Sequence, residues 1–316
     1  MKAIVLTEQG GAENLQVQEV ETPRPKSDEV LVQVHALSIN PVDIKTRKGG
    51  ALYASLKEQP PVILGWDISG VVTAVGSDVK EFRKGDAVFG MVNFPGHGRA
   101  YAEYVAAPAA HLALKPSNIT HAQAAATTLA ALTAWQVLFE QAGLVKGQHV
   151  LVHAAAGGVG HFAVQLAKHA GARVSGTASE ANARFLEELG IDRHIDYRAK
   201  KFYEELKDVD IVLDPIGGET TAHSLQVLRP GGTLVSIVGG VKDHLKPEAE
   251  ERKVVAKNYL VHSSGADMAR LAELLQAGSL KPFISHHFTF EDIARAHAQI
   301  ETGKTRGKVV VVLIAG

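Results

Sequence analysis

Residues 150–168 read VLVHAAAGGVGHFAVQLAK: an apolar run of strand length, a cluster of very small residues and then a helical pattern. A chain of this kind turns sharply between a strand and a helix and lets a diphosphate approach its backbone. The N–H groups and the dipole at the helix start favour an anion there. The stretch fits the dinucleotide-binding pattern G-x-G-x-x-G with Ala155 in place of the first glycine. It predicts the phosphate loop of a Rossmann fold, the alternative being an ordinary strand-to-helix turn in another α/β protein.

The composition excludes several classes of protein. The chain has 316 residues, of which 46% are hydrophobic and 21% charged, and a net charge of −1 with no basic block for nucleic acid. It has no cysteine, which excludes disulfides and thiolate zinc sites. Its N-terminus resembles a short strand rather than a signal peptide, and no apolar run reaches the ~20 residues of a membrane helix. We expect a soluble, cytoplasmic protein with two domains and no nucleic-acid or membrane partner.

The first part of the chain, to about Ser117, has a β-rich pattern. Short apolar or alternating runs, separated by Gly, Pro and Asp, predict a compact, barrel-like domain. These runs are Met1–Thr7, Leu15–Val20, Glu29–Ile39, Ile68–Val75, Asp86–Gly90 and Tyr101–Ala106. At the end of one of them Asn40 precedes Pro41, and this order is typical of a helix N-cap.

From His121 the sequence becomes alanine-rich and helical, and after the glycine-rich loop strands and helices alternate. The expected further strands are Arg173–Ala178, His194–Asp196, Asp210–Ile216, Thr233–Val238 and Tyr259–Ser264. Apolar strands that alternate with helices predict a parallel sheet covered on both faces. Ligands of such sheets bind beyond the carboxyl ends of the strands, where this sequence has small or hydroxylated residues.

The end of the strand expected at Arg173–Ala178 indicates the cofactor. An NAD site usually has Asp or Glu about 20 residues after the glycines, on the ribose hydroxyls. Here residues 176–179 read GTAS. A carboxylate would repel the additional phosphate of NADP, so its absence favours NADP(H). Arg184 and Tyr197 can supply a charge and a hydroxyl to that phosphate, although Arg184 is also consistent with a solvated helix residue.

The C-terminal part mixes helices and strands and ends in a very apolar segment. Residues 309–313 read VVVVL, a run that needs a buried place in a sheet. We expect this segment to return to the first domain, which would make that domain discontinuous in sequence.

Six motifs, in order, resemble the medium-chain dehydrogenase/reductase superfamily, in its zinc-free quinone oxidoreductase branch. They are NPVD at 40–43, GWDISGVV at 65–72, KGDAV at 84–88, YAEYV at 101–105, ALTAW at 131–135 and AAAGGVG at 154–160. The resemblance covers essentially the whole chain. It implies an α/β protein in which a Rossmann doubly wound parallel sheet (119–262) joins a GroES-like β-rich catalytic domain (1–118, completed by 263–316). It also implies a homodimer.

The same resemblance addresses the metal. Zinc-dependent relatives have Cys where Asn40 stands and a His-Glu pair where Trp66 and Asp67 stand, and the four-cysteine lobe of those relatives is missing. Neither Asn nor Trp is a useful zinc ligand. His153, His161 and His169 are spread along the loop and the helix that follows it, and His286 and His287 alternate faces on a strand. We therefore expect no metal.

For the cofactor, the resemblance implies that Asn40 lies near the nicotinamide. Thr133 and the Val238–Gly239 backbone would hold its carboxamide, and Lys308 would lie near the phosphates. The other expected cofactor contacts are Ala156, Gly157, Gly158, Val159, Thr177, Ser179, Arg184 and Tyr197.

Lys45 and Tyr53 fall near the substrate-pocket tyrosines of similar proteins, and either can donate a proton or a hydrogen bond. Lys45 replaces an expected aromatic residue, and a solvated helix lysine is its alternative interpretation. With Asn40 they are the candidate catalytic residues. Without zinc to polarise an alcohol, we expect hydride transfer from NADPH to a small-molecule quinone or α,β-unsaturated carbonyl. Alternatives are an enoyl-thioester reductase, a zinc-free alcohol dehydrogenase and a non-catalytic NADPH-binding protein.

Overall fold

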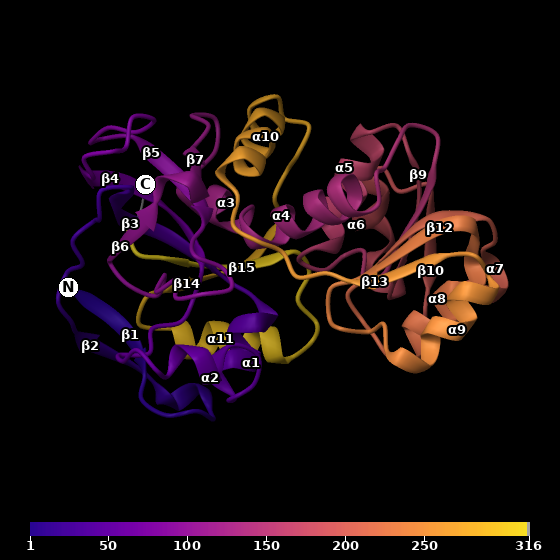
Figure 1. The fold of residues 1–316 in the computed structure, drawn as a ribbon, viewed down its shortest axis with the longest axis horizontal. Coiled ribbons are helices and arrows are strands. Elements are labelled where there is room, and N and C mark those ends of the chain that lie inside the picture. Colours follow the sequence, from indigo (N-terminus) through magenta and orange to yellow (C-terminus); the bar gives the residue numbers. More distant parts are fainter. Residues whose placement is uncertain (315–316) are drawn as a thin grey trace. The chain divides into compact units, whose positions relative to one another are not determined.

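The computed structural model describes residues 1–314 and divides into two compact units. Unit 1 consists of residues 1–132 and of the chain from His262 onward, and unit 2 consists of residues 133–261. Each unit has its own sheet and its own covering helices (Figure 1). The division places a β-rich part and a doubly wound α/β part in one chain, and the predicted fold class is confirmed.

Unit 1 is built on a seven-stranded sheet in which six strands follow the order β14-β15-β3-β4-β5-β7, and β6 also pairs with β3. The strands are β3 (Glu29–Ile39), β4 (Asp67–Val75), β5 (Ala87–Met91), β6 (Tyr104–Pro108), β7 (Leu112–Leu114), β14 (Ile284–Thr289) and β15 (Lys308–Val312). A separate antiparallel pair consists of β1 (Lys2–Leu6) and β2 (Leu15–Glu19). The long strand β3 alternates buried with half-buried residues before becoming fully buried at its end, which marks its position in the centre of the sheet.

The last strand of the chain pairs with the first part of the chain. β15 runs antiparallel to β3, with Val309 opposite Ile39 and Val312 opposite Ala36. Val309, Val310 and Val311 are completely buried there. The apolar run at the C-terminal end therefore fills a place in the sheet of unit 1.

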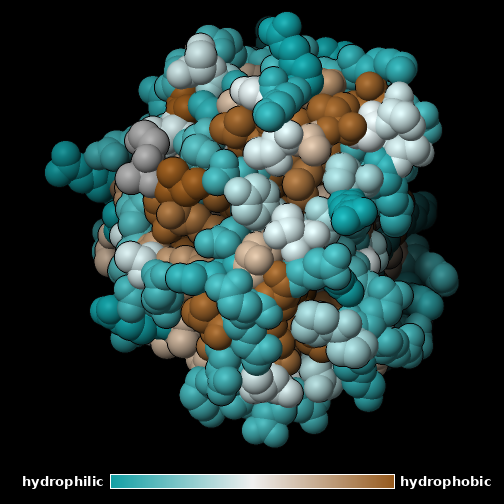
Figure 2. Space-filling view, turned by 90° about the vertical axis from the view of Figure 1, so that its left-hand side faces the viewer, coloured by the Kyte–Doolittle hydropathy of each residue, from teal (hydrophilic) through white to brown (hydrophobic). Residues whose placement is uncertain are grey.

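Short helices cover the sheet of unit 1. They are η1 (Ala12–Asn14), α1 (Pro41–Arg47), α2 (Tyr53–Leu56), η2 (Ala109–His111), α3 (His121–Ala126), α10 (Gly265–Gln276) and α11 (Ile293–Glu301). Figure 2 shows that polar residues cover most of one face of this unit, with apolar residues in separate patches. Among residues 1–314, no helix combines the length and the hydropathy needed to cross a membrane.

Unit 2 has a six-stranded, fully parallel sheet in the order β10-β9-β8-β11-β12-β13. Its strands are β8 (His149–Val152), β9 (Arg173–Ala178), β10 (Arg193–Asp196), β11 (Val209–Asp214), β12 (Leu228–Ser236) and β13 (Val255–Asn258). When β8 is counted as the first strand of this sheet, the order becomes 3-2-1-4-5-6, which is the order of a dinucleotide-binding fold. The strand order reverses next to β8, the strand that precedes the glycine-rich loop.

Helices pack on both faces of this sheet, with α5 and α6 on one side and α8 and α9 on the other (Figure 1). The helices of unit 2 are η3 (Gln136–Gln141), α5 (Gly160–His169), η4 (Glu180–Asn182), α6 (Ala183–Glu188), α7 (Phe202–Glu205), α8 (Glu219–Val227), η5 (Asp243–Leu245) and α9 (Lys246–Glu251). The core on the second side is made by side chains such as Leu151, Val212, Leu225, Leu234 and Leu245.

Three details differ from the sequence expectations. The sixth strand of the sheet is β13, which ends at Asn258, whereas the expected segment 259–264 has no regular structure. The helix expected from Glu180 begins as a 3₁₀ turn and becomes α-helical only at Ala183. The alanine-rich α3 packs on β3, β4 and β15 of unit 1, so the boundary between the units falls within α4 (Leu129–Trp135) and later than 118.

Candidate active site

The glycine-rich loop joins β8 to α5 as the sequence predicted, and its shape requires glycine where the backbone approaches itself closely. Ala154 has a positive φ of 47°, and its carbonyl accepts a hydrogen bond of 2.8 Å from the Gly157 N–H. A β carbon on Gly160 would stand 2.2 Å from the Ala154 oxygen and 2.7 Å from the Ala155 α carbon. Helix α5 can therefore start against the loop only with glycine at 160. Its N-cap, Val159, has no polar side chain to cover the helix N-terminus.

The tip of β9 carries Thr177, whose hydroxyl lies 3.0 Å from Nδ1 of His153. Nε2 of the same ring lies 2.9 Å from the Ser224 hydroxyl, which itself donates to the Thr220 carbonyl over 2.6 Å. A carbonyl only accepts, so the Ser224 hydrogen is used and Nε2 of His153 must be the donor. Burial lowers the pKa of His153 to about 4, so the ring is neutral and its Nδ1 accepts from Thr177. Thr177 is left with acceptor capacity only.

The other expected phosphate contacts lie on the segments that follow β9 and β10. Ser179 accepts from the Asn182 side chain over 3.1 Å. Arg184 is exposed on α6 and bonds to Glu188, one turn further on, over 3.1 Å. Tyr197 is 56% exposed, with the guanidinium of Arg198 5.6 Å from its ring centre. The Arg184 side chain is thus largely in solvent, and its expected contact with the phosphate stays a prediction.

The remaining expected cofactor residues occupy the loop and the neighbouring strand ends. Ala156 is buried in the loop, and Thr133 is buried in α4. Val238 is partly exposed in the turn after β12, next to Gly239 with φ of 71°.

Asp214, at the tip of β11, is a polar residue that the sequence analysis missed. Its carboxylate is completely buried and accepts from the N–H groups of Ile216 and Gly217, over 2.8 and 3.0 Å, and from the Thr221 hydroxyl. An acid at the end of an apolar strand and directly before a Pro-Ile-Gly-Gly turn was the signal that could have identified it. It fixes the turn at the carboxyl end of β11.

In unit 1, Asn40 stands between β3 and α1 and is at the centre of a buried polar cluster. Its Nδ2 donates to Oδ2 of Asp67 over 2.7 Å, and its Oδ1 accepts from the Lys308 ammonium over 2.5 Å. The backbone N–H of Asn40 donates to the Asp43 carboxylate over 2.6 Å. Asn40 is the N-cap residue of α1, yet its amide bonds to two other strands of the sheet. We name Asn40, Asp67 and Lys308 the polar triad.

Lys308, which the resemblance places near the cofactor phosphates, is buried in the polar triad. The side chain is 3% exposed, and its ammonium donates to Asn40 Oδ1 and to the Ile39 carbonyl over 3.3 Å and pairs with Asp67 Oδ2 at 3.7 Å. The ammonium therefore makes two hydrogen bonds and one longer ion pair within unit 1. Burial lowers its pKa, and Asp67 and Asp43 oppose that shift.

Three further ionisable groups near the triad are Asp43, Tyr101 and His297. The sequence did not single them out as site residues. Burial raises the pKa of Asp43 to about 8, with the Asp67 charge contributing in the same direction. The Tyr101 hydroxyl faces Asp43 and bonds to Nε2 of His297 over 2.9 Å. Burial lowers the pKa of His297 to about 3. Asp43, Asp67 and Tyr101 are part of recognisable motifs, but nothing local in the sequence indicates that His297 joins them.

Lys45 and Tyr53 stand apart from these contacts. Lys45 is exposed on α1, and Tyr53 is half-buried at the start of α2, with Lys57 Nζ 6.0 Å from its ring centre. Trp66 is completely buried, donates from Nε1 to the Gly96 carbonyl over 2.7 Å and packs edge-on against Phe94.

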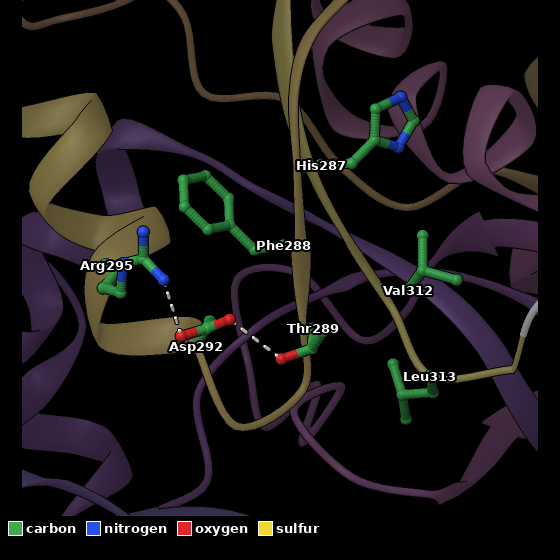
Figure 3. Close-up of a pocket in the computed structure, with 7 residues that line it drawn as sticks. All are labelled: His287, Phe288, Thr289, Asp292, Arg295, Val312 and Leu313. Carbon is green, nitrogen blue, oxygen red and sulfur yellow. Dashed lines mark hydrogen bonds and ion pairs between the residues drawn. The ribbon is translucent and has the colours of Figure 1, made fainter.

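A cavity of about 510 Å³ lies elsewhere in unit 1, beside β14, β15 and the start of α11 (Figure 3). In it Asp292 bonds to Thr289 and pairs with Arg295, each over 3.1 Å. Its other lining residues are His287, Phe288, Val312 and Leu313. None of the predicted site residues lines this cavity, so it is separate from the candidate active site.

Two family models match the chain, "Alcohol dehydrogenase GroES-like domain" over residues 26–117 and "Zinc-binding dehydrogenase" over residues 189–311. The chain is 36% identical over 323 residues to the 2-methylene-furan-3-one reductase of Solanum lycopersicum, covering 98% of this chain and 79% of that protein.

Solved structures are similar over the full length. The quinone oxidoreductase of Coxiella burnetii has a TM-score of 0.93 and 37% identity, with 99% of both chains covered. The Escherichia coli quinone oxidoreductase complexed with NADPH has a TM-score of 0.87 and 28% identity, covering 99% of this chain and 100% of that chain.

A GroES-like unit and a Rossmann unit with a glycine-rich loop define an oxidoreductase of the dehydrogenase class. The chain belongs to the medium-chain dehydrogenase/reductase superfamily, which confirms the resemblance inferred from its six motifs.

Proposed function

We propose that this chain is a zinc-independent, NADPH-dependent reductase that delivers a hydride to a quinone or to an α,β-unsaturated carbonyl. The observation that carries the proposal is the Lys308 ammonium, bonded to Asn40 and paired with Asp67 inside unit 1. By the resemblance stated above, Asn40 and Asp67 stand at positions that belong to the metal site of zinc-dependent relatives. A cation of the protein already occupies this cluster, and it would repel a divalent metal in a medium of low dielectric constant.

The donor set also does not fit zinc. Trp66, at another of the ligand positions, has an indole nitrogen that only donates, and its N–H is bonded to Gly96. Zinc requires Cys, His or carboxylate ligands in tetrahedral geometry. The matched family model whose description mentions zinc covers residues 189–311 and includes neither Asn40 nor Trp66.

The absence of a suitable donor set determines the substrate class that we propose. Oxidation of an alcohol benefits from a Lewis acid on the oxygen, whereas quinones and enones already accept a hydride readily. The reduced nicotinamide supplies the hydride when it is bound. In this chain Asn40 would donate a hydrogen bond to an oxygen of the reactants, Lys45 or Tyr53 would border the substrate, and Thr133, Val238 and Gly239 would hold the carboxamide.

The cofactor loop would hold the diphosphate through the backbone of residues 156–159 and the N-terminus of α5. The end of β9 has no carboxylate to repel a 2′-phosphate. Thr177 offers an acceptor only, which suits a ribose hydroxyl, whereas Ser179, Arg184 and Tyr197 can donate to a phosphate. These donors and the NADPH complex of the Escherichia coli relative support NADPH.

The test follows the absorbance of the reduced nicotinamide, as NADPH oxidation with an ortho-quinone, a simple enone and an enoyl-CoA supplied separately, and as NADP reduction with a simple alcohol. We expect turnover with the quinone or the enone. Turnover confined to the enoyl-CoA would identify an enoyl-thioester reductase instead, and turnover confined to NADP with an alcohol would identify a zinc-free alcohol dehydrogenase. Tight NADPH binding without turnover on any acceptor would indicate a non-catalytic binding protein.

Zinc-independence is tested by removing metals. Elemental analysis of the purified protein should find zinc far below one equivalent, and dialysis against a chelator should leave turnover unchanged. Loss of turnover in the chelator with recovery on added zinc would overturn this part of the proposal.

The open edge of the parallel sheet supports a homodimer. β13 is the last strand of the sheet, and Val255 in it and Leu260 just after it are 51% and 57% exposed. Exposed apolar side chains at an edge strand are a favourable surface for a second copy. Light scattering after size-exclusion chromatography should give twice the chain mass. The composition is consistent with a cytoplasmic enzyme, which fractionation of the source cells would test.

A further inference from the structure

We propose that Lys308 is a positioning residue that holds the Asn40 amide in one orientation for the reaction. The inference rests on the proposed function, in which Asn40 contacts the reactants. Lys308 is the first residue of β15, and the antiparallel register that pairs Val309 with Ile39 brings it beside Asn40. Lys308 and Asn40 are 268 positions apart in the chain.

The triad fixes the amide without ambiguity. Oδ1 of Asn40 faces the ammonium, and Nδ2 faces the Asp67 carboxylate. Turning the amide over would place its NH₂ against a cation and its oxygen against an anion, and both contacts would be repulsive. Asp67 cannot easily turn away, because its other oxygen accepts from the Leu129 N–H over 3.0 Å. The orientation of Asn40 is therefore set by two opposite charges, one on each side of its amide.

Two chemical consequences follow for Asn40. An amide nitrogen has two hydrogens, and Asp67 uses one, so one hydrogen remains for a ligand oxygen. A cation on Oδ1 also draws electron density from the nitrogen through the amide resonance and strengthens the remaining N–H as a donor. Lys308 thus acts on the reaction through Asn40, by fixing and polarising this donor.

A purely structural role is the competing explanation. Lys308 could serve only to neutralise the buried Asp67, since a buried charge without its partner is strongly destabilising. The two roles differ in what happens when both charges are removed. The double variant Asp67→Asn/Lys308→Met has no unpaired charge. The amide introduced at position 67 can both donate and accept, however, so it no longer dictates one orientation of the Asn40 amide.

The experiment compares wild type, Lys308→Met, Lys308→Arg and the double variant by unfolding midpoint, NADPH affinity, kcat and KM. We expect Lys308→Met to lose stability and about 10- to 100-fold in kcat, with NADPH affinity changed less than about threefold. The double variant should regain the unfolding midpoint but not kcat, and Lys308→Arg should keep part of kcat. Lys115→Met is the matched control, because Lys115 is a half-buried lysine of unit 1 bonded to the Pro116 and Ile119 carbonyls. Its kcat should equal that of wild type.

A readout that needs no turnover separates this inference from the proposed function. The side-chain amide hydrogens of Asn40, observed by NMR of protein labelled on asparagine nitrogen, should exchange slowly in wild type and quickly in the double variant. If wild type reduces no quinone or enone, the proposed function fails while this measurement still tests the positioning. Recovery of both stability and kcat in the double variant, or unchanged Asn40 signals, would overturn the role of Lys308.

Discussion

Gly176 lies against Ala155: a β carbon on Gly176 would stand 2.7 Å from the β carbon of Ala155 and 2.7 Å from Cδ1 of Ile191. Ala155 occupies the position of the first glycine in the dinucleotide-binding pattern. The methyl group that this substitution adds is accommodated by the glycine on the neighbouring strand β9. The two positions therefore determine each other's size, although one lies in β9 and the other in the loop after β8.

Gly176→Ala should destabilise the protein by about 1–3 kcal/mol, because overpacking forces neighbouring groups to shift. Gly176 has no positive φ, so the cost is steric rather than conformational. Urea unfolding measures it. Ala155→Gly in the Gly176→Ala background should recover part of the loss, and strictly additive effects of the two changes would contradict the contact.

The cofactor phosphate provides the second prediction. Arg184→Ala should lower the preference for NADPH over NADH by about 10- to 100-fold, since a charged hydrogen bond to phosphate contributes roughly 1.5–3 kcal/mol. Tyr197→Phe should act in the same direction and more weakly. Steady-state KM values for both cofactors measure the effect. Arg252→Ala is the control, because Arg252 makes the same kind of one-turn ion pair, with Glu248 over 2.9 Å, on another helix. Equal loss with NADPH and NADH would show that Arg184 does not contact the phosphate.

The hydrogen bonds that join Thr177, His153 and Ser224 lead to the third prediction. Thr177→Val removes the donor to Nδ1 and leaves a buried acceptor unpaired, at a cost of about 1–3 kcal/mol. Thr177→Ser keeps the hydroxyl and should cost less. Chemical denaturation compares the two variants, and nitrogen NMR of the ring should show the Nε2–H tautomer in wild type. Equal stabilities, or an Nδ1–H tautomer, would refute the assigned directions.

Stability should fall as the pH drops from 7 toward 5. The pKa values of His121 and His153 are lowered to about 4 and that of His297 to about 3, in each case chiefly by burial. Below the unfolded pKa of about 6.5, the unfolded chain binds protons that the folded chain excludes, so acid favours unfolding. Asp43 acts oppositely, because its pKa is raised to about 8 and the folded state keeps its proton, but the three histidines outnumber it.

Urea midpoints at a series of pH values measure this dependence. His297→Gln removes one titrating group. The slope of the unfolding free energy against pH should therefore fall by the equivalent of about one proton between pH 4 and 6.5. A midpoint that is constant or rises toward pH 5 would show that the folded state binds these protons as well as the unfolded state does.

Local patterns in the sequence were sufficient for most of unit 2. The strand at 173–178 and the glycine-rich loop were predicted at their observed positions, because apolar runs and glycines act over a few neighbouring residues. The sixth strand was misplaced because apolar residues occur on both sides of Asn258, and only pairing with β12 decides which of them join the sheet. The partners of Thr177 were equally invisible, since His153 and Ser224 come from other elements.

The sequence by itself determined the superfamily and the glycine-rich loop between β8 and α5, and its resemblance predicted that Asn40 and Trp66 stand where zinc-dependent relatives have ligands. Only the tertiary structure decided the surroundings of Lys308, which is buried against Asn40 and Asp67. The physical reason is the range of the interactions. Periodicity and turn chemistry depend on neighbours in sequence, whereas the Lys308–Asn40 contact exists only because β15 pairs with β3 in one register.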